Sequence, residues 1–316
     1  MISVRELTKT FDGKPAVDHI FLDIPEGMMF GLLGTNGAGK TTMLRLLSGI
    51  LEPDFGEILI DDESLSVSAE KIFYLPDTPY YFPNATMEQM AKFYQRQYPG
   101  MDAEGVTYMA ESLNLDVRQP IRTFSKGMKR QAFLILALCA GTKYLLCDEV
   151  FDGLDPIAAE VMKNLFRQEM KERKFTVVVA SHRLQELEDI CGNIAILHKG
   201  GLVTAGDMRV QAENMWKFQC AFHTNADKGE ITEEEGWSSC GKLQDIMDRL
   251  ENTLDIVRIH SEGSFITLTV RGDKEEIRAK LKEEHPAVLN EIPMSLEEIF
   301  IAEMEVKGYD IRKVLH

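Results

Sequence analysis

The chain has 316 residues, of which 44% are hydrophobic and 27% charged, so it can bury a substantial core, and its length suggests two domains. Its formal net charge of -16 disfavours nucleic acid as the main partner, because backbone phosphates must be neutralised by Lys and Arg. No two of the five cysteines show metal-ligand spacing, and we interpret them as small buried hydrophobes in a reducing cytosol. They are Cys139, Cys147, Cys191, Cys220 and Cys240.

The apolar segments are too short for a targeting or spanning role. The N-terminus, MISVRELTKTFDGK, has no apolar core of signal-peptide length. The longest apolar run, AFLILALCAG, is about half of what spans a bilayer. These features predict a soluble, cytoplasmic chain, and any membrane process that it serves needs other chains for the membrane part.

Predicted strands and helices alternate along the first two thirds of the chain. Residues 2–8 and 19–24 are expected to form short strands around FDGKPAVD, and MMFGLLG an all-apolar strand covered on both faces. A helix from about Lys40 to Gly49 and the strand GEILIDD follow. Residues 84–117 predict two or three helices, one of them with a capping box formed by Thr86 and Gln89.

The next group of predicted helices and strands begins with a helix that Ser125 caps and that continues through KRQAFLILALCA. The buried strand YLLCDE, the amphipathic helix DPIAAEVMKNLFRQEMKER and the strand FTVVVAS come next. A helix, RLQELEDIC, and a hairpin of NIAILHKG with GLVTAGD complete it. This alternation predicts a largely parallel sheet with helices on both faces.

The pattern changes after about Met208. Strand MWKFQCAFHT, helix KLQDIMDRLEN, strands LDIVRIH and SFITLTVRG, helix KEEIRAKLKEE and strand AVLNEIP give the order βαββαβ, a split βαβ sandwich. A last helix opens at Ser295, with Glu298 three residues on. We therefore predict one domain over residues 1–208 and a second, α+β domain over residues 209–316.

The stretch GTNGAGKT matches G-x-x-x-x-G-K-[ST] between a predicted strand and a helix, the context that confirms a phosphate-binding loop. Glycines let backbone N–H groups turn toward phosphates, and the helix N-terminus adds its positive end. Lys40 is expected to reach the β- and γ-phosphates, Thr41 to ligate Mg²⁺ and Thr42 to bind the α-phosphate. The candidate nucleotide-binding residues are Gly34, Thr35, Asn36, Gly37, Ala38, Gly39, Lys40, Thr41 and Thr42.

The strand YLLCDE ends in two acids that suit a metal-dependent hydrolysis. Two adjacent carboxylates at a buried strand end are costly unless a cation or water satisfies them. We expect Asp148 to hold Mg²⁺ through water and Glu149 to polarise the attacking water.

Three further pieces follow in a fixed order: FSKGMKRQ at 124–131, GLDP at 153–156, and His182 after the next strand. Alone, the first would be a helix N-terminus with a basic first turn, and His182 a capping or core histidine. Together with the two earlier motifs, the set resembles the nucleotide-binding domain of ABC ATPases: Walker A, signature motif, Walker B, D-loop and switch histidine. The resemblance covers residues 1–208. It implies a P-loop NTPase fold with a mixed sheet, a helical subdomain at about 84–140 and the extra α+β domain.

The resemblance also implies roles at matching positions. In such proteins two domains face head to tail and close two ATP molecules between them. Ser125 and Gly127 would contact the γ-phosphate held by the partner's Walker A, and Asp155 would link the two sites. His182 would contact the γ-phosphate and hold the water beside Glu149, so that Lys40, Glu149 and His182 form the catalytic set.

Phe11 matches the aromatic residue that stacks on adenine, although a core aromatic at a strand end is the competing interpretation.

Three departures from the family pattern stand out. Lys126 replaces the second glycine of the signature, as is familiar in exporters of the drug, antibiotic and polysaccharide type. The usual Gln-Arg order is transposed at 130 and 131. Asp77 stands where the family usually has Gln, and could still ligate Mg²⁺, through water and with less reach.

The function implied is an ATP-hydrolysing motor of an ABC transporter, of exporter type because the tail IPMSLEEIFIAEME is similar to tails in that branch. Its cofactors would be ATP and Mg²⁺. Its partners would be a second nucleotide-binding subunit, identical or homologous, and a separate integral-membrane permease that holds it at the inner face of the cell membrane. The C-terminal domain would be an accessory or dimerisation domain.

A groove near residues 77–98 is expected to receive the permease. Its aromatic residues either form this docking surface or pack the helical subdomain. They are Tyr80, Tyr81, Phe82, Phe93 and Tyr94.

One alternative function is a soluble ABC ATPase acting on nucleic acid or ribosomes, which the acidic balance disfavours. Another is a regulatory protein with a vestigial site, which the intact motif residues disfavour.

Overall fold

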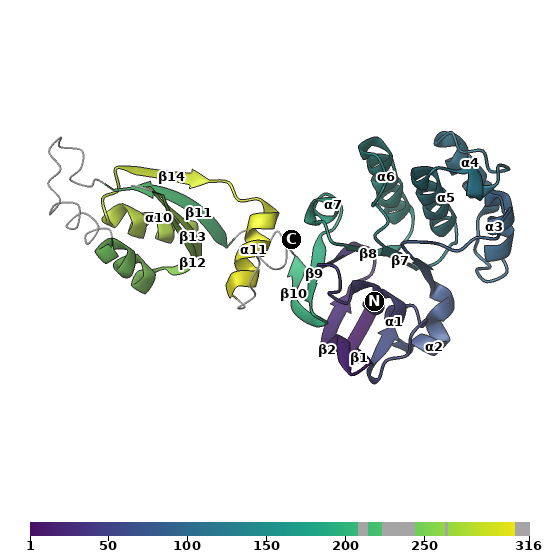
Figure 1. Ribbon diagram of the computed structural model, residues 1–316, viewed down its shortest axis with the longest axis horizontal. Coiled ribbons are helices and arrows are strands. Elements are labelled where there is room, and N and C mark those ends of the chain that lie inside the picture. Colours follow the sequence, from purple (N-terminus) through teal and green to yellow (C-terminus); the bar gives the residue numbers. More distant parts are fainter. Residues whose placement is uncertain (208–213, 223–243, 263–264, 307–316) are drawn as a thin grey trace. The chain divides into compact units, whose positions relative to one another are not determined.

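A computed structural model describes residues 1–207, 214–222, 244–262 and 265–306. The chain separates into two compact units, Met1–Gly206 and Asp207–His316 (Figure 1). Each unit has its own sheets and its own hydrophobic core, and each is described by itself.

An antiparallel sheet begins the first unit, in the order β2-β1-β4-β5. Its strands are β1 (Ile2–Phe11), β2 (Lys14–Ile24), β4 (Phe55–Ile60) and β5 (Glu63–Ser64). The expectation of two short strands separated by FDGKPAVD is wrong, because the strands continue through it and turn only at Asp12 and Gly13. Both turn residues have positive φ, 50° and 75°, which suits a two-residue hairpin turn.

A six-stranded sheet carries the rest of the unit, in the order β10-β9-β3-β8-β7-β6. Strands β9, β3, β8, β7 and β6 pair in parallel, as the sequence predicts. Their carboxyl ends therefore meet at one edge, where ligands bind in open α/β sheets. The bounds are β3 (Met29–Leu33), β6 (Ile72–Leu75), β7 (Tyr144–Asp148), β8 (Thr176–Ser181), β9 (Asn193–His198) and β10 (Gly201–Asp207).

The predicted helices and their caps are confirmed. Thr86 accepts a hydrogen bond from Gln89 N, and the Gln89 side chain accepts one from Thr86 N. Ser125 accepts from Met128 N at 3.2 Å. The helices are α1 (Lys40–Leu47), α2 (Leu65–Ser68), α3 (Met87–Tyr94), α4 (Ala103–Ser112), α5 (Lys126–Leu138), α6 (Pro156–Glu172) and α7 (Leu184–Glu188), with short 3₁₀ turns at Ala69–Lys71 and Ile121–Thr123.

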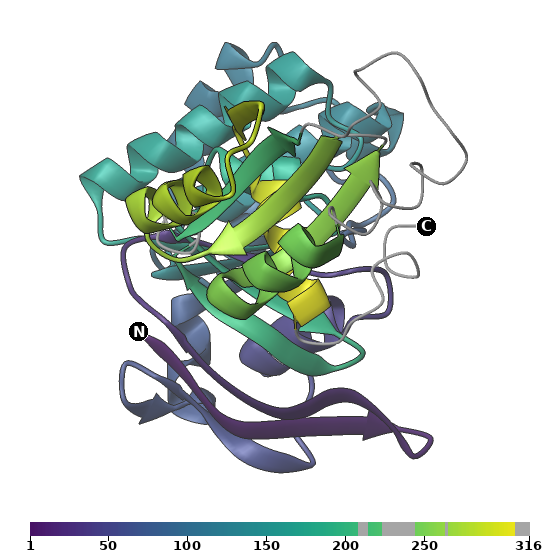
Figure 2. The same ribbon diagram turned by 90° about the vertical axis from the view of Figure 1, so that its left-hand side faces the viewer.

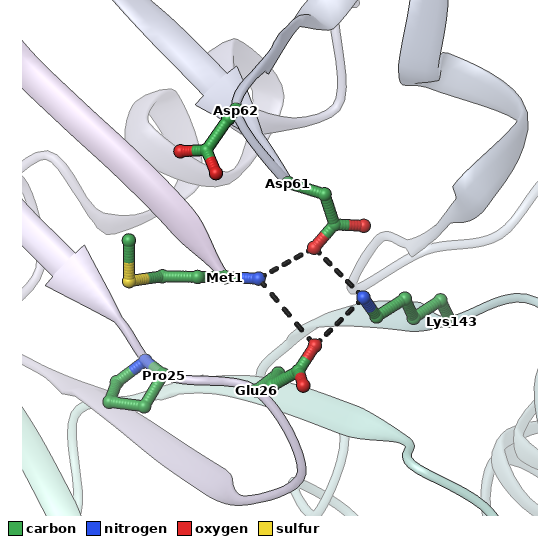
Figure 3. A pocket seen from close by; sticks show the side chains of 6 residues that line it. All are labelled: Met1, Pro25, Glu26, Asp61, Asp62 and Lys143. Carbon is green, nitrogen blue, oxygen red and sulfur yellow. Dashed lines mark hydrogen bonds and ion pairs between the residues drawn. The ribbon is translucent and has the colours of Figure 1, made fainter.

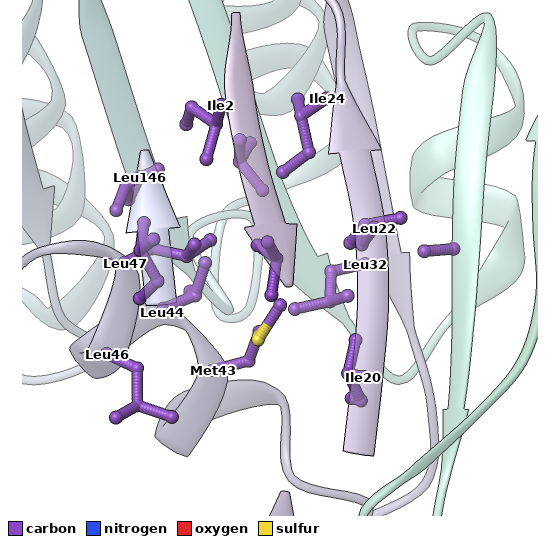
Figure 4. Packing of buried hydrophobic residues seen from close by; sticks show 14 of the residues in the cluster. Ile2, Ile20, Leu22, Ile24, Leu32, Met43, Leu44, Leu46, Leu47 and Leu146 are labelled. Atoms are coloured by element: carbon purple, nitrogen blue, oxygen red, sulfur yellow. The ribbon is translucent and has the colours of Figure 1, made fainter. Parts of the chain in front are cut away.

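Helix α1 lies among side chains of both sheets of the first unit (Figure 4). Met43, Leu44, Leu46 and Leu47 are all fully buried. Burying such side chains contributes about 1.5–3 kcal/mol each. The helix that begins at Lys40 is therefore fixed in place before any ligand arrives.

An ion cluster ties the antiparallel sheet to β7 (Figure 3). Lys143 Nζ lies 2.8 Å from both Asp61 Oδ1 and Glu26 Oε2, and the Met1 amino group lies 2.7 Å from Asp61. Burial alone would raise the pKa of Asp61, but hydrogen bonds from Lys143, the Met1 amino group and Tyr144 outweigh it and hold that pKa below its usual range. The cluster is a structural brace and lies apart from the loop at 34–41.

The second unit has the predicted βαββαβ order, with sheet order β12-β13-β11-β14. Helical residues 244–253 and α10 pack on one face through Leu250, Ile277 and Leu281, and α11 packs against Met215 and Val257 (Figure 2). The predicted capping box of Ser295 and Glu298 is present. The elements are β11 (Met215–Ala221), β12 (Asp255–Glu262), β13 (Phe265–Arg271), α10 (Lys274–Glu283), β14 (Val288–Ile292) and α11 (Leu296–Val306). Cys240 lies outside the described residues, and the other four cysteines are buried and free.

Among the residues that the structure describes, no helix combines the length and the apolar character needed to cross a membrane.

Candidate nucleotide-binding site

Two glycines shape the loop between β3 and α1, because neighbouring backbone atoms lie too close to them to leave room for a side chain. A Cβ on Gly34 would lie 2.6 Å from the Leu197 carbonyl oxygen and 2.8 Å from Ala38 Cβ. Gly39, at φ 106°, has no room for a Cβ because the Ala16 carbonyl oxygen occupies that space. The backbone therefore runs tightly over β2 and β9 and delivers the amides that precede α1 to the carboxyl edge of the sheet.

Lys40, the first residue of α1, is only 6% exposed. Its Nζ donates to the carbonyl oxygens of Gly34 at 2.7 Å and Thr35 at 3.2 Å. It also lies 3.4 Å from Glu149 Oε1. The ammonium is thus held inside its own loop, with the Glu149 carboxylate as a charged neighbour across the site.

Glu149 follows the end of β7 with φ 50°, an uncommon backbone for a residue other than glycine. Such conformations cluster at functional sites, where the surrounding structure holds them. Its amide donates to Ala180 O at 3.0 Å, which fixes it beside β8, and its Oε2 lies 2.9 Å from His182 Nδ1. Lys40, Glu149 and His182, which come from three distant parts of the sequence, therefore form one contiguous set.

Asp148 is 3% exposed, and its Oδ1 has no hydrogen-bond partner among the described residues. Burial raises the pKa of Asp148, a hydrogen bond from Thr41 lowers it, and the nearby Glu149 raises it again. Tyr74 Oη lies 3.4 Å from Asp148 Oδ2, and burial together with that carboxylate raises the pKa of Tyr74 to about 12. Sequence reasoning missed Tyr74, because a tyrosine on a buried strand carries no signal of its own.

The residues present fit a magnesium ion that is shared with a substrate. A buried carboxylate oxygen without a donor is costly, and a cation or its water shell would satisfy it. No group of three or more His, Cys, Asp or Glu side chains within the described part of the chain could hold a metal alone. Asp148 and Thr41 would hold the ion, with phosphate oxygens completing its shell.

The signature segment and the D-loop lie next to each other. Ser125 is exposed at the N-terminus of α5, and a Cβ on Gly127 would meet the Gly153 carbonyl at 3.4 Å, an ordinary contact. Asp155 accepts from Ile157 N and Ala158 N at 3.0 and 2.9 Å, so it caps α6. All three residues therefore sit at helix starts. The first amides of α5 can meet an anion, whereas Asp155 itself caps those of α6 and leaves its side chain at the surface for a second chain.

Phe11 is 46% exposed at the tip of the β1–β2 hairpin, with Lys9 Nζ 5.9 Å from the ring centre. A core aromatic would be buried, so that interpretation is wrong. The same hairpin touches the phosphate loop at Gly39 through Ala16. Phe11 thus lies on the strand pair that borders the loop, where an adenine could stack on it.

Asp77 lies after β6, and the structure places it against Arg130 of α5. Arg130 Nη2 donates to Asp77 Oδ1 at 2.6 Å, and Nη1 donates to the Asp77 carbonyl oxygen. The other oxygen, Oδ2, has a long 3.5 Å contact with Thr78 Oγ1. Sequence reasoning singled out Asp77 but missed its partner, although the unusual residue at 130 was a signal.

The aromatic residues near 77–98 divide into two sets. Tyr81 packs on Phe133, and Tyr94 packs on Phe73, so these two rings belong to the subdomain core. The other three, Tyr80, Phe82 and Phe93, are 74%, 43% and 43% exposed, and Phe82 meets each of the other two rings edge to face. We call these three the aromatic ridge.

A parallel sheet with a glycine-lined loop, a buried lysine at a helix start and an acid pair on the adjacent strand defines a P-loop nucleoside triphosphatase. Comparisons with known proteins identify the family. The family model described as ABC transporter matches residues 17–152. The chain is 32% identical to the ABC transporter ATP-binding protein YtrB of Bacillus subtilis over 308 residues, which are 96% of this chain and 97% of the relative.

Two further proteins are similar over about two thirds of the chain. The bacitracin transport ATP-binding protein BcrA of Bacillus licheniformis is 30% identical over 64% of this chain and 68% of its own length. The structure of cbiO1 from Clostridium perfringens, described as part of the ABC transporter complex cbiONQ, matches with a TM-score of 0.57 and 26% identity over 67% of this chain and 90% of that one. The chain belongs to the ATP-binding proteins of ABC transporters, and it is an ATPase subunit of such a transporter.

Proposed function

We propose that this chain hydrolyses magnesium-bound ATP at two sites, each closed between the phosphate loop of one copy and the signature segment of another, and so drives a separate permease of exporter type. The observation that carries this proposal is the joining of Lys40, Glu149 and His182 next to buried Asp148. The similarity to a bacitracin transport ATP-binding protein supports a transport motor. The exporter type rests on Lys126 in the signature segment and on the tail IPMSLEEIFIAEME.

The residues divide the chemistry among them. Lys40 and the amides of residues 34–42 bind the phosphates, and the exposed ring of Phe11 stacks on the base. Glu149 accepts the proton of the attacking water, while His182, bonded to Glu149 at 2.9 Å, orients that carboxylate and meets the γ-phosphate. Magnesium supplies charge neutralisation for the phosphate oxygens when it is bound.

Asp77 remains a proposed metal-site residue with a restricted role. Its Oδ1 is committed to Arg130, so only Oδ2 is left to bind a water of the metal's shell. Ser125, Gly127 and Asp155 are proposed to serve the partner's nucleotide, because all three lie at helix starts on adjoining loops.

A complementation experiment tests the shared sites. Lys40→Ala removes phosphate binding, and Gly127→Asp brings a carboxylate to the signature helix at a position where an added Cβ fits. Each variant alone should be inactive. Mixed dimers of the two contain one intact site, so the mixture should regain ATP hydrolysis. A mixture as inactive as its components, alongside an active wild type, would contradict sites shared between copies.

The aromatic ridge is proposed to receive the permease, since three exposed rings, with Phe82 in contact with the other two, form an apolar surface. Phe82→Ser should weaken co-purification with the membrane subunit, whereas ATP hydrolysis by the isolated chain should be unchanged. Tyr108→Ser, which removes an aromatic ring that is 74% exposed on α4, is the matched control. Equal retention of the membrane subunit by both variants would contradict docking on the ridge.

The unit from Asp207 onward is proposed as an accessory or dimerisation domain, because it has a core of its own and none of the site residues lies in it. Dimerisation through it predicts that Lys40→Ala, which cannot bind ATP, still associates without nucleotide. Sedimentation of that variant as a strict monomer at all concentrations would contradict this role.

A further inference from the structure

Arg130 is a buried cation that lies outside the phosphate loop. Its side chain is 4% exposed, although arginine is rarely buried unless its donors are paired. It binds Asp77 twice, through the carboxylate and the carbonyl, and its Nε donates to the Asp152 carbonyl at 3.3 Å. One guanidinium therefore connects three segments: α5, the segment after β6 and the turn that follows Glu149.

Lys126, one turn earlier on α5, reaches the same turn. Its Nζ lies 2.9 Å from Asp152 Oδ2, and its methylene groups lie against Gly153. This side chain is 70% exposed, so the pair contributes little by itself. Arg130 is buried and bonded to both neighbours, so it is the residue on which the connection depends.

Asp77 and Arg130, which both depart from the family pattern, thus form one ion pair. Asp77 adds a further negative charge near Asp148. A carboxylate at this place is tolerable because Arg130 neutralises it at 2.6 Å. Removing the Asp77 carboxylate leaves the buried Arg130 guanidinium without its charged partner, which is costly. Removing Arg130 leaves Asp77 solvated, since its side chain is 55% exposed, but breaks the connection between the segments.

We infer that Arg130 is a positioning residue for ATP hydrolysis, which acts through its ion pair with Asp77 to hold the catalytic turn in register with α5. A neutral glutamine at position 77 would make one or two hydrogen bonds of variable geometry. The ion pair between Arg130 and the Asp77 carboxylate is stronger and more directional. The inference rests on the site roles proposed above for Asp77 and Glu149.

A double-mutant cycle on the full chain tests this pair. Asp77→Gln and Arg130→Gln should each lower kcat by about tenfold, the size of coupling that residues in contact show. The KM for ATP should stay unchanged in both, because neither residue binds phosphate. The double variant should lose no more kcat than the more impaired single variant, because the second substitution removes an interaction that the first has already broken. Arg167→Gln, which removes an arginine of α6 from an exposed pair, is the control and should not change kcat.

The outcomes separate the inference from the proposed function. A double variant whose loss equals the product of the two single losses would overturn it, and so would a change in KM alone. Should Arg130→Gln fail to fold, Arg130→Lys keeps the positive charge but lacks the paired donors of the guanidinium. A wild-type kcat in Arg130→Lys would overturn the inference too. Loss of kcat in Arg130→Lys would support it. Hydrolysis by wild type and not by Glu149→Gln leaves the proposed function standing in either case.

Discussion

Replacing Glu149 by glutamine is the sharpest test of the site, because it removes one charge and keeps the shape. The carboxylate has two partners, Lys40 Nζ at 3.4 Å and His182 Nδ1 at 2.9 Å. Glutamine can still bond to both, but it cannot take a proton from water. Loss of a general base costs about 10²–10⁴-fold in turnover, which corresponds to about 3–5.5 kcal/mol in the activation barrier.

The affinity of Glu149→Gln for ATP should not fall with its rate of hydrolysis. Glu149 competes with phosphate for the ammonium of Lys40, and a neutral amide at 149 competes more weakly than the carboxylate does. We therefore expect ATP affinity to be kept or increased while hydrolysis stops. ATP-bound dimers should then accumulate.

Phosphate release at saturating ATP and size-exclusion chromatography with ATP measure these two effects. Glu160→Gln, the same charge change on the exposed side of α6, is the control and should hydrolyse ATP at the wild-type rate. Hydrolysis by Glu149→Gln at the wild-type rate would remove Glu149 from the reaction. A loss of both binding and hydrolysis would show that the carboxylate organises the loop instead.

Three other substitutions address binding, metal and stability. Lys40→Ala should abolish nucleotide binding, measured with a fluorescent ATP analogue, and undiminished affinity would contradict the role of the loop. Asp77→Ala should raise the Mg²⁺ concentration needed for hydrolysis, and an unchanged titration would remove Asp77 from the metal's surroundings. Lys143→Met should lower the free energy of unfolding by about 1–3 kcal/mol at neutral pH, since it removes charge-assisted hydrogen bonds. Because the folded-state pKa values of Glu26 and Asp61 are both lowered, the difference from wild type in urea unfolding should persist down to pH 4.5 and shrink only as the pH falls further, through those lowered pKa values; a difference that vanished well above pH 4.5 would contradict this.

Local signals explain why much of the site could be predicted. The glycine spacing around Lys40 specifies its own loop, strand and helix, and hydroxyl residues such as Thr86 and Ser125 cap helices through bonds to amides three residues away. Glu149 was placed by its position at the end of an apolar strand. Each of these predictions depends on neighbours in sequence, which a single chain displays directly.

Contacts between distant residues could not be predicted. Arg130 and Asp77 lie 53 positions apart, and neither forms part of a periodic pattern that would align them. The length of the β1–β2 hairpin depends on Asp12 and Gly13 accepting positive φ, while the intervening residues are too polar to look like strand. The separate antiparallel sheet over α1 follows from tertiary packing, which strand propensity does not report.

The charges around Lys40 suggest how binding could prepare the base. An ammonium has three donors, and Lys40 already spends two on the carbonyls of Gly34 and Thr35. The third is the one that Glu149 can use at 3.4 Å, and a phosphate oxygen would compete for it. The positive φ of Glu149 and its amide bond to Ala180 hold the carboxylate in place when that contact is lost. Under the proposed mechanism, substrate binding would thus release Glu149 Oε1 from Lys40 to water while Oε2 stays on His182, so the base would become available only when the phosphate is present.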